Sequence, residues 1–486
     1  MLIPLDPRQW DFSKAAHLLN RAGFGGTPEQ IEALRALGFT NAVESLLDAP
    51  DDLQLFPKPA WAAPQNLAEM RQSILMMAPE EQAEKKKQQQ KNARNEVVEL
   101  IGWWLTRMRY TPNPAREKMT LFWHGHFATS VAKVKRAYFM WLQNETLRQN
   151  AFGNFGKMVK DISRDPAMLI WLDTRQSKKE HPNENFAREL MELFTLGIGN
   201  YTEKDIQEAS RAFTGYRINP FNETFRYAPF QHDDGDKTFF GRTGRFTGDD
   251  IVDIIAKQPA CASFITKKIW EFFVADDPHP GVLDVLAWNF RQSGGAIRPL
   301  MREIFSSAAF YAPDVIRSQI KSPVQWLVQT AKELEIGIPP GPLTVNALRQ
   351  MGQAPFIPPN VKGWDGGRAW ITTSTLLFRY NLSNYAVGNG PMGAQKLRLN
   401  GELKGPERQV TPSAQLNLAK IAPPELRDDS RRLVETLSKR LFQETPDARV
   451  TGSFVKFIDS KKPDTGDATM RELLHLMMST PQFQLT

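Results

Sequence analysis

The chain has 486 residues, of which 41% are hydrophobic and 24% are charged, a composition typical of a globular protein with a substantial core. Its single cysteine, Cys261, excludes an intramolecular disulfide and any metal site built from several cysteines. The net charge of +7 is spread thinly, and the one dense basic run, at 85–87, follows glutamates as on a solvated helix face. We therefore expect no nucleic-acid partner.

The N-terminal sequence lacks the basic segment and following apolar stretch that mark a signal peptide. No window approaches the ~18 consecutive apolar residues that a membrane-spanning helix needs. The sequence therefore predicts no membrane span and a cytoplasmic location, with the periplasm as the alternative.

Helical patterns begin near the N-terminus and recur along most of the chain. A helix is expected over 12–22, and a second opens at the capping box of residues 27–30. Residues 57–66 have the composition of a linker, whereas 79–110 predict one long helix, followed by another that starts at Pro114. Further helices are expected over 133–150, 154–163, 184–196, 203–214, 249–257, 260–274, 280–293, 297–307, 322–335, 344–352, 430–443 and 468–480.

One stretch, 217–247, changes character, because aromatic residues there surround an acidic turn that begins at His232. This pattern predicts a small β-hairpin. The expected fold is all-α, a large multi-helix domain with a small β-hairpin excursion near 217–247. The expected parts are N-terminal helices (1–56), a central helical domain with the candidate site (67–216), the hairpin (217–247), a C-terminal helical module (248–387), a flexible insert (388–430) and terminal helices (431–486).

The most informative stretch is the predicted helix 184–196. Glu184, Arg188 and Glu192 recur at every fourth position on its polar face, which predicts a salt-bridge ladder. Glu189 lies instead at the border of the apolar face, with Asn185 one turn before it. A carboxylate at such a border is partly desolvated, which raises its pKa and suits a general acid or base. The alternative is a carboxylate bonded to a neighbouring loop or arginine.

Three histidines are candidate site residues. His181 lies just before this helix, where it is either a loop residue or a site residue at a helix N-terminus that favours anions. His124 and His126 would share one face of an extended backbone and could then bind one metal ion, but in a helix they would point about 160° apart. With His181 and a glutamate they would form a ligand set suited to Zn, Fe or Mn. Histidines packed among aromatic rings are the alternative.

A second candidate surface is the loop 358–370, which carries Trp364, Arg368 and Trp370. Such a loop can stack on sugar rings or other flat ligands, or its tryptophans can pin it to the core. The chain contains no nucleotide-binding glycine loop, no G-x-S-x-G elbow and no H-E-x-x-H motif. A nucleotide-driven enzyme, a dehydrogenase of the Rossmann type, an α/β-hydrolase and a zincin are therefore not expected.

These stretches resemble a bacterial family catalogued as domain of unknown function 1800. The resemblance covers nearly the whole chain. It implies a mostly helical protein and a partner from the family catalogued as domain of unknown function 1501, which looks like an exported relative of alkaline phosphatases or sulfatases. The segments that carry the resemblance are 16–25, 116–119, 126–127, 181–190, 232–237, 264–273, 360–370 and 481–483.

Two functions are compatible with these observations. The first is an enzyme, for example a hydrolase, that acts by acid–base or metal-assisted chemistry on a polar substrate such as a saccharide. Its catalytic residues would be Glu189, Glu184, His181 and Asn185, its substrate contacts Arg188, Trp364, Arg368 and Trp370, and its ligands for a divalent metal ion His124 and His126. The second is a non-enzymatic assembly or export partner of the phosphatase-like protein.

Overall fold

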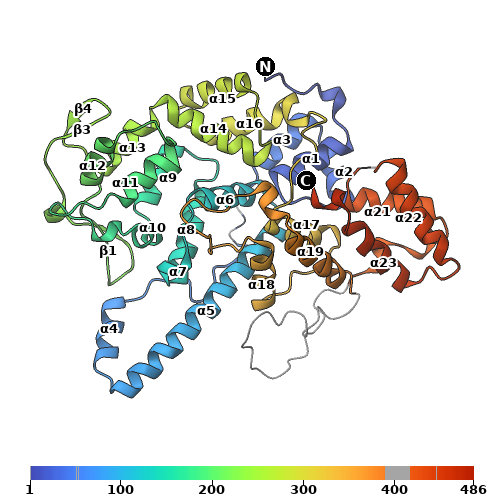
Figure 1. Cartoon of the computed structure of the whole chain (residues 1–486), viewed down its shortest axis with the longest axis horizontal. Helices are drawn as coiled ribbons and strands as arrows, with labels where there is room; N and C mark the ends of the chain where they lie inside the picture. The colour runs from blue at the N-terminus through green and yellow to red at the C-terminus, as the bar shows by residue number, and fades with distance from the viewer. Residues whose placement is uncertain (1, 51, 53, 389–415, 445) are drawn as a thin grey trace.

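The computed structural model describes the whole chain except residues 1, 51, 53, 389–415 and 445 (Figure 1). Over the described residues it contains 23 α-helices and two small antiparallel sheets of two strands each. The predicted all-α class with a small β excursion is therefore confirmed. Most of the predicted insert at 388–430 lies outside the described residues.

The helices of the first half surround the stretch that carried most of the predictions. The long helix expected over 79–110 is present with the same bounds, as α5. The helices of the first half have the bounds α1 Phe12–Ala22, α2 Pro28–Ala36, α3 Phe39–Leu47, α4 Leu67–Leu75, α5 Pro79–Tyr110, α6 Pro114–His126, α7 Val131–Val134, α8 Ala137–Gln149, α9 Phe155–Ser163, α10 Pro166–Trp171, α11 Asn185–Glu189 and α12 Glu203–Ala212.

The second half continues the helical pattern after the two small sheets. None of the described helices combines the length and the apolar character that crossing a lipid bilayer requires. The bounds are α13 Gly248–Ala256, α14 Pro259–Phe273, α15 Pro280–Gln292, α16 Ile297–Ser306, α17 Pro323–Glu333, α18 Pro342–Met351, α19 Thr373–Ala386, α20 Leu418–Ile421, α21 Ser430–Leu441, α22 Ala448–Lys461 and α23 Asp467–Met478.

The β excursion consists of two short hairpins. Strand β1 (Tyr216–Ile218) pairs with β2 (Phe225–Tyr227), and β3 (Lys237–Phe239) pairs with β4 (Arg242–Gly244). Between the hairpins, Asp233 accepts hydrogen bonds from the Arg211 guanidinium of α12, which anchors the acidic turn. The two hairpins thus form a small β region that is attached to α12.

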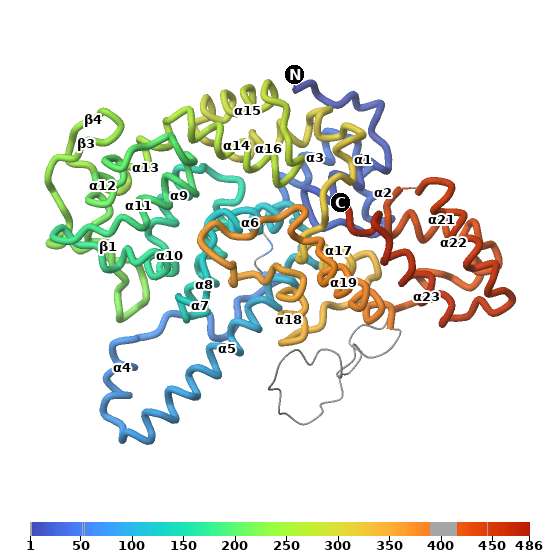
Figure 2. The backbone as a smooth tube through the Cα atoms, viewed as in Figure 1, coloured from blue at the N-terminus to red at the C-terminus, as the bar shows by residue number. Residues whose placement is uncertain are grey.

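Two hydrophobic cores hold the molecule together, and α6 contributes to both. Met119, Trp123 and Phe127 of this segment belong to a core that also contains residues from 5–47 and 248–315. Leu121 belongs to the other core, which is built mainly from α5, α8 and residues 324–483. Figure 2 shows α6 near the centre of the molecule. The division of the chain into the predicted segments stays a prediction.

A buried ionic network joins α5, α6 and α8. The Glu117 carboxylate lies 2.9 Å from Nε of Arg107 and 2.6 Å from Nε of Arg148. Asp52 pairs with Arg107, and Glu145 pairs with Arg148 at 2.5 Å. Burial alone would raise the pKa of Glu117, but the two arginines outweigh burial and lower it. The network therefore stays charged inside the core, with a carboxylate beside each guanidinium.

A second buried carboxylate, that of Asp165, forms no ion pair with any residue that the structure describes. Asp165 caps α10 by accepting a hydrogen bond from the backbone N–H of Met168 at 2.9 Å, and it accepts another from Gln143 at 2.8 Å. Burial raises the pKa of Asp165 to about 7 because these neutral donors only partly offset the lost hydration.

Candidate functional site

The stretch that motivated the catalytic prediction begins as an α-helix and continues as a π-helix. The side chain of Asn183 accepts a hydrogen bond from the backbone N–H of Asn185 at 2.9 Å, which starts α11. After Glu189 the chain forms a π-helix over Leu190–Thr195, so a regular α-helix over 184–196 is wrong beyond Glu189. The wide turn leaves room for the Thr195 hydroxyl to donate to the carbonyl of Leu190 at 2.5 Å. Such π turns occur frequently at functional sites.

The predicted salt-bridge ladder is only half present. Arg188 bonds Glu184 at 3.3 Å, but its other carboxylate partner is Glu203 of α12, with two contacts of 2.9 Å. Glu192 accepts instead from the Tyr201 hydroxyl at 2.9 Å. The π turn alters the spacing after Glu189, so position 192 no longer follows the α-helical repeat. The Arg188 side chain thus links α11 to α12 through its contacts with Glu203.

Glu189 is half-buried, and its carboxylate has no hydrogen bond or ion pair to any described residue. Burial raises its pKa, Glu192 adds to the rise, and Arg188 offsets part of it. Asn185, one turn earlier, is exposed. A partly desolvated carboxyl group with a raised pKa has the properties expected of a general acid or base.

His181 lies in the exposed loop between Ser177 and α11. Its backbone N–H donates to the carbonyl of Lys178 at 2.8 Å, which closes a tight turn. The Ser177 hydroxyl accepts from the backbone N–H of Asn183 at 3.0 Å and ties this turn to the start of the helix. Among the described residues, no hydrogen bond, ion pair or ring contact joins His181 or Glu189 to either histidine of α6.

His124 and His126 are both inside α6, so their side chains point in different directions. His124 faces Trp104 and Phe356, and its Nε2 accepts from the backbone N–H of Phe356 at 2.9 Å. His126 bonds the carbonyl of Phe194, in the π-helix, at 2.9 Å. Burial lowers the pKa of each imidazole to about 3, so both are neutral near pH 7.

This geometry gives no support to a shared metal ion. Within the described residues, no three side chains of the His, Cys, Asp and Glu types lie where they could hold one ion. The aromatic-packed alternative describes what both histidines do in the structure, where each links α6 to a different neighbouring element. A metal role for His124 and His126 stays a prediction.

The loop 358–370 packs against the end of α6. Gly363 has a φ of +90°, and a Cβ there would lie 2.5 Å from the carbonyl oxygen of Gly125, so only glycine allows this approach. Trp364 is half-buried, with its ring 5.8 Å from that of His124, and Trp370 is buried. Arg368 is exposed. The two tryptophans therefore hold the loop on the protein, and only Arg368 of the three predicted contacts is freely presented.

A hollow lined by several arginines lies elsewhere, between α4 and the first hairpin. It has a volume of about 720 Å³. The backbone N–H of Ala68 donates to the carbonyl of Pro220 at 3.3 Å, which joins α4 to the turn between β1 and β2. We call this hollow the arginine cleft, and its lining residues are Leu67, Ala68, Arg71, Gln72, Leu75, Val134, Arg136, Phe139, Ile170, Arg175, Ile218 and Pro220.

Three arginines and no carboxylate line the arginine cleft. Arg136 is fixed by two contacts of 2.9 Å to Glu223, whose side chain is fully buried behind it. Arg71 and Arg175 are exposed and have no hydrogen bond or ion pair to any described residue. Over the described residues, the cleft therefore presents two guanidinium groups without a carboxylate partner, Arg71 from α4 and Arg175 from the segment after α10.

Comparison with known protein families identifies the family to which the chain belongs. A family sequence model matches residues 17–485. The chain belongs to the family described as Protein of unknown function (DUF1800). The resemblance expected from the sequence motifs is thus confirmed, while no curated protein and no solved structure matches the chain.

Two features of this DUF1800 protein escaped sequence reasoning. Residues 67–75 follow the predicted linker but form α4, which supplies one wall of the cleft. The side chain of Asn66 accepts from the N–H of Glu69 at 3.1 Å, and this N-cap was a local signal for the helix. No local signal indicates that Arg71 and Arg175 face one hollow, because 104 positions separate them.

Proposed function

We propose that this DUF1800 protein binds an organic anion in the arginine cleft. The observation that carries the proposal is the pair of unpaired guanidinium groups, Arg71 and Arg175, in a hollow whose lining has no carboxylate. The planar guanidinium fork matches the oxygens of carboxylate, sulfate and phosphate groups. A volume of about 720 Å³ lies within the range of small-molecule sites.

The walls of the arginine cleft restrict the ligand further. Phe139, Ile170 and Ile218 give it apolar surface, so the ligand combines an anionic group with a carbon framework. Arg136 already balances Glu223, which makes it a rigid third donor rather than a free charge. A carboxylated or sulfated saccharide meets both this surface and the expectation of a polar substrate.

Calorimetric titration with citrate, inorganic phosphate and a sulfated disaccharide tests the proposal. We expect at least one anion to bind, with an affinity that falls as salt rises from 50 to 200 mM. The double variant Arg71→Ala/Arg175→Ala should weaken binding by at least about ten-fold, because two charge-assisted contacts are lost. Its unfolding free energy should stay within about 0.5 kcal/mol of the parent, since both side chains are exposed and unpaired.

The matched control is Arg349→Ala, which removes an exposed arginine of α18 outside the cleft. It should leave anion binding unchanged. Equal affinity of the double variant and the parent, or no binding of any of the three anions at millimolar concentration, would contradict the proposal.

Acid–base catalysis at Glu189 is a second candidate function, favoured by its unpaired carboxyl, its raised pKa and the π turn that follows it. Chromogenic glycosides and esters would be screened for turnover. We expect Glu189→Gln to lower any turnover found by at least about 100-fold, the usual share of a general acid or base. Glu32→Gln, at the exposed pair with Arg35 and outside the candidate site, serves as the control. Full turnover by Glu189→Gln excludes this role.

The non-enzymatic alternative makes a different prediction, which concerns the partner from the DUF1501 family. Co-purification of the two proteins supports a complex, and separate elution at micromolar concentration contradicts it.

A further inference from the structure

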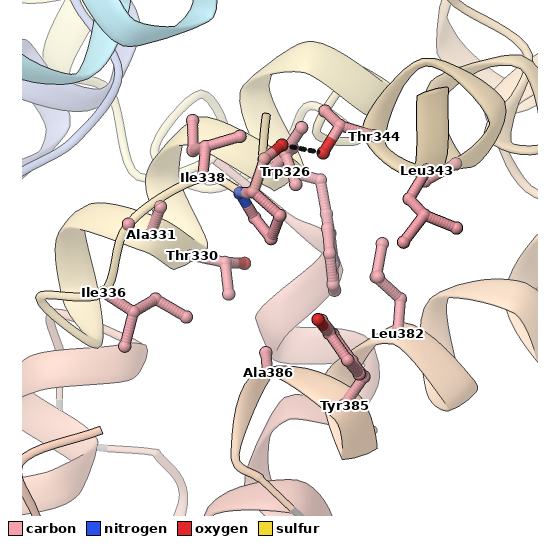
Figure 3. Close-up of a pocket in the computed structure, with 14 residues that line it drawn as sticks. Trp326, Thr330, Ala331, Ile336, Ile338, Leu343, Thr344, Leu382, Tyr385 and Ala386 are labelled. Carbon is pink, nitrogen blue, oxygen red and sulfur yellow. Dashed lines mark hydrogen bonds between the residues drawn. The ribbon is translucent and has the colours of Figure 1, made fainter. Parts of the chain in front are cut away.

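A second hollow differs from the arginine cleft because it has no charged side chain in its lining. It lies between α17, α18 and α19 and is closed on one side by residues 336–339 (Figure 3). Aliphatic side chains such as Ile336, Ile338 and Leu382 form most of its wall, together with the indole of Trp326. None of its lining residues is charged. We call it the apolar pocket.

Polar groups without partners occur within this apolar wall. The Nε1 of Trp326 and the hydroxyl of Thr330 are buried and have no hydrogen bond in the structure. Tyr385 is half-buried, and its hydroxyl likewise has no hydrogen bond to a described residue. Figure 3 shows the hydroxyls of Thr330 and Tyr385 directed into the space beside Trp326. By contrast, the hydroxyl of Thr344 bonds the carbonyl of Pro339.

Buried polar groups are normally paired, so those of Thr330 and Trp326 need an explanation. An unmade hydrogen bond in an apolar surrounding lowers stability, and a ligand oxygen placed there would restore it. The enclosed space is about 50 Å³, enough for only a few non-hydrogen atoms. Leu343 is 37% exposed although it lines the pocket, so the hollow reaches the surface and a longer tail can extend outward.

We infer that the apolar pocket binds a neutral, mainly apolar small molecule through a hydroxyl or carbonyl oxygen held by Thr330 and Tyr385. A charged ligand does not fit, because no lining residue would compensate its charge. A wholly apolar ligand would leave both hydroxyls unpaired. This site is independent of the anion site proposed for the arginine cleft, since the two share no residue.

The test compares two probes of equal chain length, 1-hexanol and hexanoate, by titration calorimetry at pH 7. We expect saturable binding of 1-hexanol in the millimolar range, and binding of hexanoate at least about ten-fold weaker. Thr330→Val and Tyr385→Phe should each weaken the binding of 1-hexanol by about five-fold, the effect of losing one neutral hydrogen bond. Leu343→Trp should weaken it further by closing the opening.

The matched control is Tyr380→Phe, which removes a hydroxyl from the same helix but outside the pocket. It should bind 1-hexanol like the parent. Because Thr330 is buried, thermal unfolding of each variant confirms that it is folded, and Tyr385→Phe provides the second test at a half-buried position. The inference is overturned if 1-hexanol does not saturate, if hexanoate binds equally well, or if Tyr385→Phe and Leu343→Trp both retain the parent affinity.

Discussion

The buried ionic network and the arginine cleft are both built around arginines, yet only one of them is complete. In the network, Arg107 and Arg148 share Glu117, and Asp52 and Glu145 supply further negative charge. In the cleft, Arg136 is paired with a carboxylate, whereas Arg71 and Arg175 have no carboxylate partner among the described residues.

The difference separates charges that hold the fold from charges that are available to a ligand. Burying an ion is costly unless a counterion accompanies it, and the two guanidinium groups of the network lie beside three carboxylates. Exposed arginines keep their hydration and need no internal partner. Arg136 combines both situations, because it lines the cleft but neutralises the buried carboxylate of Glu223.

The largest effect is expected where the network loses its shared carboxylate. Glu117→Gln removes the carboxylate that Arg107 and Arg148 share and leaves each buried guanidinium with one carboxylate partner, so the free energy of unfolding should fall by about 3–5 kcal/mol. Urea denaturation measures this loss. The control Glu32→Gln breaks an exposed pair with Arg35 and should lower the free energy of unfolding far less, because solvent screens that pair. Equal losses in both variants would remove the distinction between the buried and exposed arginines.

Asp165 sharpens the comparison because it is buried without any cation. The folded protein keeps its proton up to a pKa of about 7, whereas the unfolded chain releases it near the usual value of 3.8. Between these pH values the unfolded state binds fewer protons, so this group lowers stability as pH rises. The decrease is on the order of 4 kcal/mol at about 1.4 kcal/mol per pH unit.

Asp165→Asn should remove this decrease while the amide oxygen still caps α10. Urea denaturation between pH 4 and 8 measures the change in slope. Asp429→Asn, which changes an exposed aspartate that caps α21, is the control and should leave the pH profile unaltered. Parallel profiles for Asp165→Asn and the parent would show that Asp165 is ionised throughout.

A smaller loss is expected for Arg136, which links the two situations. Arg136→Met leaves Glu223 buried, with the backbone N–H of Gln65 as a remaining donor, and should cost about 2 kcal/mol. Adding Glu223→Gln should recover part of this loss, because the unpaired charge is then removed. Thermal and urea unfolding of both variants measure it. A double variant no more stable than Arg136→Met would show that the pair contributes no electrostatic stability.

Sequence reasoning succeeded where a feature depends on neighbouring positions. The capping box of Thr27 and Gln30 forms as expected, and Glu189 occupies the half-buried border that helical periodicity indicated. The π turn after Glu189 could not be foreseen, because it changes backbone hydrogen-bond partners without a distinctive composition. For His124 and His126, the same local reasoning gave the correct geometry only in its helical alternative, in which the two side chains point apart.

The arginine cleft and the apolar pocket could not be predicted from the sequence, for a different reason. Each is assembled from segments far apart in the chain, and periodicity describes one segment at a time. Nothing in the sequence around Arg136 indicates that Glu223, 87 positions later, is its partner. Candidate sites on single motifs were therefore easier to propose than the hollows that the folded chain forms.

The position of α6 between the two hydrophobic cores has a consequence for how the protein denatures. Loss of either core would strip this helix of part of its packing and weaken the other core at the same time. Folding of the two halves is thereby thermodynamically coupled, and heating should produce one cooperative calorimetric transition rather than two. A substitution that destabilises one half will then also lower the stability of the sites in the other half.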